Sequence, residues 1–177
     1  MGQRFFLFCL CLWAGGLWAA APSEPVVKAA LVANLSNYVE WSENVWSAQH
    51  TQLCIAGRGS VVESLQALHN QILLGRRIAV SYRNWPGDGQ GCQVLFLGDA
   101  IGRGQGEWLQ EWTTPLARQP VLTVCEGDDF VAHGCMIGLV REGTQVAFDV
   151  NMGALKRAHL RLSAHLLRLA RTLYGKP

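Results

Sequence analysis

Little net charge is present in this 177-residue sequence: 15 Lys and Arg residues stand against 13 Asp and Glu residues, for a formal net charge of +2. Nucleic-acid binding driven by bulk charge is therefore excluded, because no strong positive field remains to hold phosphates. Disorder is excluded by composition, since 50% of the residues are hydrophobic and only 16% are charged.

Motifs of catalysis and metal binding are also missing. The sequence has no GxSxG elbow, no CxxC and no HxxxH. Residues 57–60 are glycine-rich and follow a predicted strand, but Val62 stands where a dinucleotide site needs a third glycine, so we expect a tight turn. Residues 126–129 offer too few oxygen ligands for calcium and predict a solvated loop. We therefore expect no metal, no cofactor and no enzymatic activity.

Residues 1–21 predict a cleavable export signal, and residues 22–177 predict one domain. Arg4 supplies positive charge, residues 5–14 are an unbroken apolar run, and residues 19–21 are all alanine. A membrane anchor is the alternative, but apolar character from residue 5 to residue 21 barely suffices to span a bilayer and is interrupted by Gly15 and Gly16. The export signal is favoured.

Four cysteines lie outside this leader: Cys54, Cys92, Cys125 and Cys135. An even number of cysteines in an exported chain predicts disulfides, and four cysteines allow three pairings. A zinc site is the alternative. It is disfavoured because CxxC is missing and the spacing from Cys125 to Cys135 is too long for a zinc knuckle.

Helical spacings and apolar runs alternate along the chain. Ser60 and Glu63 form a capping box at the start of the second helix. This order predicts a layered α/β sandwich with a mixed sheet flanked by helices and stabilised by disulfides. Helices are expected at 26–41, 60–69, 107–112 and 153–174, and strands at 53–56, 77–82, 92–97, 120–125, 136–140 and 145–150.

The last predicted helix carries two stripes. An apolar stripe, expected to dock on the sheet, comprises Leu155, Leu162, Leu166, Leu169 and Leu173; a basic stripe comprises Arg157, Arg161, His165 and Arg168. A basic stripe is most often the solvated side of a helix. Leu160 and Leu167 nevertheless widen the apolar surface, which leaves room for a protein partner or a second copy of the chain.

Polar and aromatic residues on the first predicted helix are a second candidate site. Asn34 and Tyr38 share a face, where a buried amide must find hydrogen-bond partners. A structural amide and a ligand contact are both open. The tryptophans are expected in the core or in a lid, and an exposed one would be a binding residue: Trp41, Trp46, Trp85, Trp108 and Trp112.

Seven short segments, in order over residues 28–170, resemble the YfiR-like family of periplasmic proteins. They are KAAL at 28–31 with Asn34, Tyr38 and Trp41; LCI at 53–55 with Gly57; CQVLF at 92–96; PVLTV at 120–124; Phe130 with Gly134, Met136 and Ile137; FDVN at 148–151; and LRLS at 160–163 with LLRLA at 166–170.

The resemblance implies a periplasmic protein without catalysis. Such a protein binds the periplasmic part of an inner-membrane diguanylate cyclase and represses it, which limits cyclic di-GMP and biofilm formation. The resemblance also implies an outer-membrane lipoprotein that draws the repressor away, a capacity to form homodimers, and a response to redox state. The partner contact is then expected at Arg157, Arg161 and Arg168.

The resemblance also bears on the disulfides, because Cys54 and Cys92 match the pair that the family links. Cys125 and Cys135 depart together from the residues expected at their positions, which predicts an added Cys125–Cys135 bridge.

The alternative function is a periplasmic small-molecule receptor that acts on another membrane sensor. Its pocket would be lined by Asn34, Tyr38 and Trp41. An enzyme would need a nucleophile beside a base, and no such pair can be assembled from the sequence.

Overall fold

The computed structural model describes residues 21–41, 50–102 and 104–175. Residues 1–20 of the expected export signal, and Trp46, lie outside the described residues. The helices are α1 Glu24–Leu35, η1 Ser36–Tyr38, α2 Ser60–Gln66, α3 Gln105–Leu116, α4 Met152–Arg157 and α5 Ala164–Leu169. The strands are β1 Val39–Glu40, β2 His50–Ala56, β3 Ile72–Leu73, β4 Arg76–Tyr82, β5 Val94–Leu97, β6 Leu122–Glu126, β7 Ile137–Glu142, β8 Gln145–Asn151, β9 Arg161–Leu162 and β10 Thr172–Tyr174.

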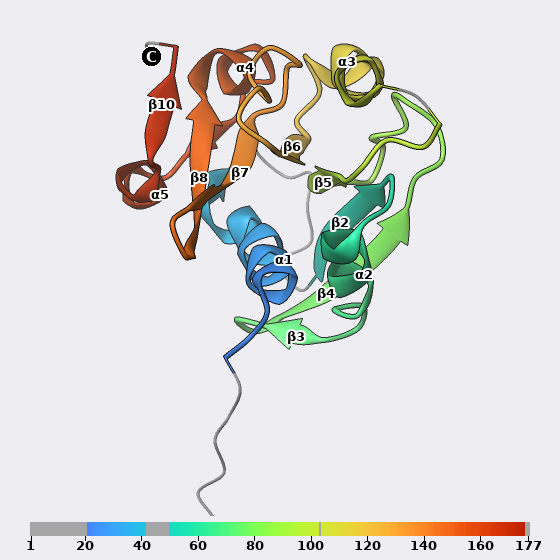
Figure 1. The fold of residues 1–177 in the computed structure, drawn as a ribbon, viewed down its shortest axis with the longest axis vertical. Coiled ribbons are helices and arrows are strands. Elements are labelled where there is room, and N and C mark those ends of the chain that lie inside the picture. Colours follow the sequence, from blue (N-terminus) through green and yellow to red (C-terminus); the bar gives the residue numbers. More distant parts are fainter. Residues whose placement is uncertain (1–20, 42–49, 103, 176–177) are drawn as a thin grey trace, which may run out of the picture.

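A mixed sheet runs through the molecule in the order β10-β8-β7-β6-β5-β2-β4-β3 (Figure 1). The five strands from β4 to β7 in this order are parallel, while β3 and β8 run antiparallel to their neighbours β4 and β7. Strand β10 pairs parallel with β8. The predicted α/β fold with a mixed sheet flanked by helices is confirmed.

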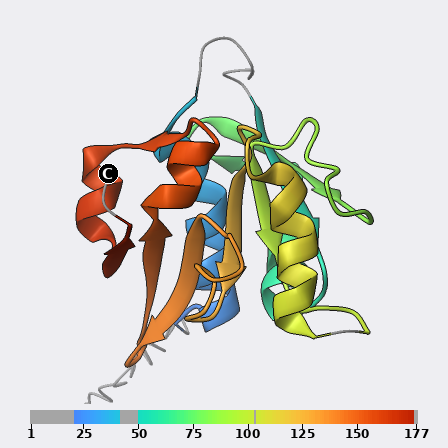
Figure 2. The same cartoon turned by 90° about the horizontal axis from the view of Figure 1, so that it is seen from above.

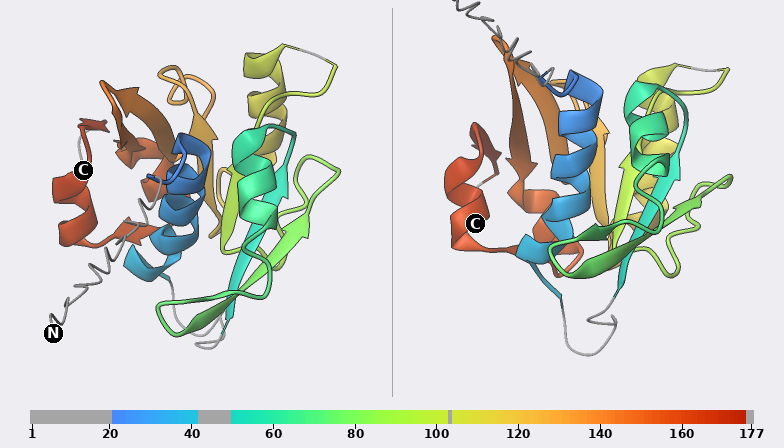
Figure 3. Two further views of the ribbon diagram at one scale, coloured as in Figure 1. Left: turned by 60° about the horizontal axis from the view of Figure 1, so that its bottom comes forward. Right: turned by 90° about the horizontal axis from the view of Figure 1, so that it is seen from below.

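Each face of the sheet has its own apolar core. Along β5, Val94 and Phe96 belong to the cluster that includes α1 and α2, whereas Leu95 and Leu97 belong to the cluster that includes α3. This alternation is the two-residue period of a strand buried on both faces. Figures 2 and 3 show α1 and α2 on one side of the sheet and α3 on the other.

The first two helices differ from expectation at their ends. Helix α1 ends at Leu35 and not at residue 41, because the chain turns through η1 and Val39 and Glu40 pair with Leu162 and Arg161. The predicted capping box is wrong, since the N-cap of α2 is Gly59, whose φ of 120° suits glycine and which has no side chain to cap the helix start.

The predicted helix over residues 153–174 is wrong in its length. Helix α4 stops at Arg157, because His159 adopts a left-handed φ of 54° and Leu160 N–H donates to the carbonyl of Leu155, as in a Schellman-type helix end. Residues of β9 then pair with β1, and Ser163 starts α5 by accepting a hydrogen bond from Leu166 N. The predicted apolar stripe is correspondingly divided: Leu155, Leu162 and Leu166 are buried, while Leu169 and Leu173 are exposed.

A buried ion pair fixes the C-terminal segment to the sheet. Asp149 on β8 is 0% exposed, and its carboxylate accepts hydrogen bonds from Arg171 Nε at 2.9 Å and Nη2 at 2.5 Å. The exposed carboxylate of Asp128 also contacts Arg171, at 3.2 Å. The hydrogen bonds to Asp149 raise the pKa of Arg171, so the guanidinium stays charged throughout the physiological range. Arg171 N–H donates to the carbonyl of Phe148, which places β10 against β8.

A second ion-pair cluster joins α1 to the end of β6. Lys28 Nζ lies 2.6 Å from Glu126 and 2.8 Å from Glu24. Burial by itself would lower the pKa of Lys28, but the hydrogen bonds to Glu126 and Glu24 outweigh burial and raise it. The hydrogen bond from Lys28 also lowers the pKa of Glu24.

Both predicted disulfides, Cys54–Cys92 and Cys125–Cys135, are present. Their Cα atoms are 5.7 Å and 6.2 Å apart, within the range that a disulfide spans. All four cysteines are fully buried in the cluster beneath α3. Each bridge starts in the carboxyl half of a parallel strand, since Cys54 lies on β2 and Cys125 on β6. Each ends in a loop that enters a later parallel strand, since Cys92 precedes β5 and Cys135 precedes β7.

We predict that Asp149→Asn lowers the free energy of unfolding by about 1.5–3 kcal/mol, because the buried acceptor of a charge-assisted bidentate contact is lost. Asp128→Asn is the matched control: this side chain touches the same guanidinium but is 83% exposed, so its change should stay within about 0.5 kcal/mol. Urea unfolding followed by circular dichroism measures both. Equal effects of the two substitutions would contradict a structural role for the buried pair.

The two bridges should differ in their contribution to stability. The chain-entropy relation predicts a loss of about 4 kcal/mol for Cys54→Ala/Cys92→Ala and about 3 kcal/mol for Cys125→Ala/Cys135→Ala. The reason is that the first bridge closes a separation of 38 residues and the second a separation of 10. Denaturant melts of the two double variants give the comparison, and the reverse order of stability would refute it.

Candidate functional site

An apolar hollow is enclosed by α4, β9 and α5. Its volume is about 340 Å³. The buried side chains of Leu155 and Leu160 form its inner wall, and the half-buried Leu167 comes from α5. The hollow exists because the chain reverses at His159 and returns through β9, so that α4 and α5 present leucines toward a common space. It is lined by Met152, Leu155, Lys156, Leu160, Arg161, Leu162 and Leu167.

Exposed basic side chains border this hollow and the one next to it. Lys156 lines both the apolar hollow and a neighbouring open hollow of about 580 Å³, to which Arg157 and His159 also contribute. Arg118, in the turn after α3, completes the second hollow. Among the residues that the structure describes, no carboxylate lies within 4 Å of these four side chains. We call Arg118, Lys156, Arg157, His159 and Arg161 the basic rim.

The three arginines expected at a partner contact lie on three different elements. Arg157 ends α4, Arg161 begins β9 and Arg168 is on α5. All three are exposed, but the continuous basic stripe predicted for them does not exist, because the helix is interrupted. Arg161 pairs with Glu40 at 3.2 Å across the β1–β9 ladder. The other two have no carboxylate partner in the described part of the chain.

The second predicted set lies beside the first. Tyr38 stacks on His165 of α5 with ring centroids 6.0 Å apart, and its carbonyl accepts a hydrogen bond from Ser163 N. Trp41 Nε1 donates to the carbonyl of Ser36 at 3.3 Å. Asn34 Oδ1 accepts from Asn37 Nδ2 at 2.8 Å, which favours the interpretation as a structural amide. Tyr38 therefore joins the N-terminal segment to the C-terminal segment, whereas these hydrogen bonds of Asn34 and Trp41 stay within the N-terminal segment.

The glycine-rich segment at 57–60 is a turn held by backbone pairing. Arg58 N–H donates to the carbonyl of Asp99 at 3.1 Å, and Asp99 N–H donates back to Arg58 at 2.8 Å. The Asp99 carboxylate lies beside Gly59 at the start of α2, where a phosphate would have to bind. Among the described residues, no group of three or more His, Cys, Asp or Glu side chains is placed to hold a metal ion.

Sequence reasoning missed Arg118, Lys156 and His159 as members of the site. Lys156 directly precedes Arg157, and this dibasic pair was the available local signal. Arg118 had no such signal, because only the packing of the chain brings the turn after α3 next to the end of α4. Figure 1 shows α3 and α4 next to each other along the same side of the molecule.

Fold and surface together define a class: a disulfide-bonded α/β protein whose surface carries an apolar hollow with a basic rim. Within the described residues, no helix combines the length and the apolar character that crossing a bilayer requires. Residues 25–171 match the family described as YfiR/HmsC-like. The chain therefore belongs to the YfiR/HmsC-like family, a family of periplasmic regulators, and the resemblance carried by the seven sequence segments is confirmed.

Proposed function

We propose that this protein is a non-enzymatic periplasmic repressor that binds the periplasmic part of an inner-membrane diguanylate cyclase. Residues 1–21 direct its export and are removed, and residues 22–177 act as one domain. Membership of the YfiR/HmsC-like family supports this function, as do two buried disulfides that suit an oxidising compartment. Repression lowers cyclic di-GMP and limits biofilm formation. An outer-membrane lipoprotein that competes for the repressor, and a homodimer, belong to the same proposal.

The single observation that carries the proposed contact is the apolar hollow with its basic rim. A protein partner gains affinity by inserting an apolar side chain between Leu155, Leu160 and Leu167. Acidic residues around that anchor face Lys156 and Arg157, whose charges no described carboxylate neutralises. The repressor holds the cyclase inactive because it binds the inactive state more tightly than the active state.

The alternative function, a small-molecule receptor with a pocket at Asn34, Tyr38 and Trp41, has less support. Tyr38 and Trp41 pack against the core on the α1 side of the sheet, and each has an internal partner. A ligand there would have to replace the stacking of Tyr38 on His165 or the hydrogen bond from Trp41 to Ser36.

Charge reversal at Arg157 and Arg168 tests the proposed contact. Arg157→Glu/Arg168→Glu places repulsive charges against acidic partner residues, so cyclic di-GMP should rise toward the level of cells that lack the protein. Both side chains are exposed and without a described carboxylate partner, so the fold should be retained. The measurements are cellular cyclic di-GMP by mass spectrometry and co-purification of the cyclase with the repressor from membranes.

Arg77→Glu is the matched control, because Arg77 is an exposed arginine on β4, toward the other edge of the sheet. It should repress like the unmodified protein. Unchanged cyclic di-GMP in the Arg157/Arg168 variant, with normal export and folding, would exclude this surface as the contact.

A further inference from the structure

A third pocket, of about 240 Å³, opens at the carboxyl ends of β2 and β4. It lies near the point where the strand order reverses, since β4 follows β2 on one side and β5 pairs with β2 on the other. Ligands of parallel α/β sheets bind preferentially at such a point. The pocket faces α3 and lies toward the β3 edge of the sheet, whereas the basic rim lies toward the β10 edge.

Four of the ten residues that line it are aromatic, and Arg83, Asn84 and Glu111 add polar groups to the wall. Trp108 and Trp112 of α3 are buried, with ring centroids 5.8 Å apart, and supply the inner surface. Tyr82 is held in place because its hydroxyl donates to the carbonyl of Gly57 at 2.5 Å. Gly57 allows this close packing: a Cβ there would lie 2.9 Å from the Trp108 ring and 2.5 Å from the Asp99 carbonyl.

Two large apolar side chains at this pocket are exposed to solvent. Trp85 is 74% exposed and Ile101 is 54% exposed, although both line the pocket. Large apolar side chains grouped in this way around a cavity mark a binding site more often than scattered single ones. An exposed indole next to two buried ones can cover one face of a flat ring while the inner wall covers its edge.

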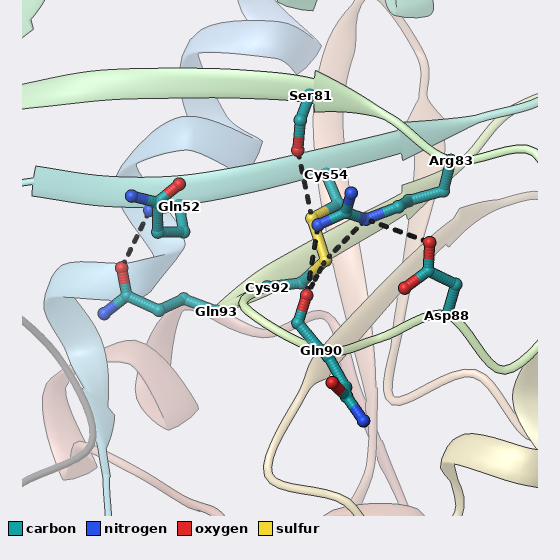
Figure 4. The surroundings of a disulfide bond; sticks show 8 residues. All are labelled: Gln52, Cys54, Ser81, Arg83, Asp88, Gln90, Cys92 and Gln93. Atoms are coloured by element: carbon teal, nitrogen blue, oxygen red, sulfur yellow. Dashed lines mark hydrogen bonds and ion pairs between the residues drawn. A yellow bond between two sulfur atoms is a disulfide. The ribbon is translucent and has the colours of Figure 1, made fainter.

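Arg83 adds a cation to the aromatic wall. Figure 4 shows its guanidinium next to the Cys54–Cys92 bridge, with Asp88 and Gln90 on its other sides. Nε donates to Cys92 Sγ at 3.4 Å, and Nη2 donates to the Gln90 carbonyl at 3.1 Å. The closest carboxylate, Asp88, is 3.9 Å away, and Nη1 has no hydrogen-bond partner among the described residues. The guanidinium is thus fixed, charged and only loosely compensated, which suits an incoming carboxylate.

We propose that this pocket binds a small aromatic carboxylate, with its ring against Trp85, Trp108 and Trp112 and its carboxylate on Arg83. The volume is smaller than that of pockets for drug-sized molecules, so the ligand has one or two rings and is not a nucleotide. This site goes beyond the proposed function, because it lies apart from the basic rim and does not depend on the identity of any protein partner. The Cys54–Cys92 bridge supports Arg83 and thereby the carboxylate end of the site.

Three probes of one shape and different charge test the proposal: phenylacetate, phenylacetamide and phenethylamine. Isothermal titration of the oxidised protein without its leader should show saturable binding of phenylacetate, about tenfold tighter than that of the neutral amide. Phenethylamine should not bind measurably. Trp85→Ala should weaken phenylacetate binding about tenfold, and Arg83→Gln should abolish the preference for the acid over the amide.

Leu74→Ala is the control, since Leu74 is 66% exposed on the β3–β4 turn and does not line the pocket. Its affinity for phenylacetate should equal that of the unmodified protein. Because Trp85 is exposed, its variant should fold even if Arg83→Gln does not, and thermal melting verifies this. The proposal is overturned if phenylacetate shows no saturable binding at millimolar concentration, if the amine binds as tightly as the acid, or if Trp85→Ala binds like the Leu74 variant.

Discussion

The contact between Asp149 and Arg171 fixes the C-terminal end of the described chain, β10, against the sheet. Helix α5 buries only Leu166 completely, so its own packing is a weak constraint on its position. The wholly buried carboxylate on β8 holds Arg171 by two hydrogen bonds, and this fixes β10 in register with β8 immediately after α5. The β1–β9 ladder fixes the segment on the other side of α5. These contacts hold both ends of the segment that carries Leu162 and Leu167, two of the leucines that line the apolar hollow.

The central strands could be predicted from the sequence because their signal is local. A run such as residues 94–97 is apolar at every position, which is required when both faces of a strand are covered. The end of α4 could not be predicted in this way. A left-handed residue after a helix is usually glycine, and here it is His159. The pairing of Leu162 with Val39 joins residues far apart in the chain, so it leaves no trace in the periodicity of either segment.

The candidate site shows the same division between local and non-local information. Arg157, Arg161 and Leu167 were recognisable as basic or apolar residues in excess of what one helix needs. Their arrangement was not recognisable, because a continuous helix would place them on fixed faces. The observed reversal instead puts Arg161 and Leu167 in the lining of the apolar hollow and Arg157 in the lining of the neighbouring hollow. Ser163 was the available signal for a new helix start, since serine is a preferred N-cap, but the strong leucine pattern on both sides obscured it.

The free energies of the contacts show which part of the candidate surface lets the repressor distinguish the inactive from the active state of its proposed partner. Moving a partner from 99:1 active to 1:99 requires the inactive state to bind about 10⁴-fold more tightly, or ~5.5 kcal/mol. Exposed ion pairs contribute about 0–1 kcal/mol each and are screened by salt, so the basic rim alone falls short. Burying one large apolar side chain contributes about 1.5–3 kcal/mol, so two such side chains, or one together with several rim contacts, reach this range. The inactive state of the partner must therefore offer apolar surface to the hollow that the active state withdraws, while the rim sets orientation and the rate of encounter.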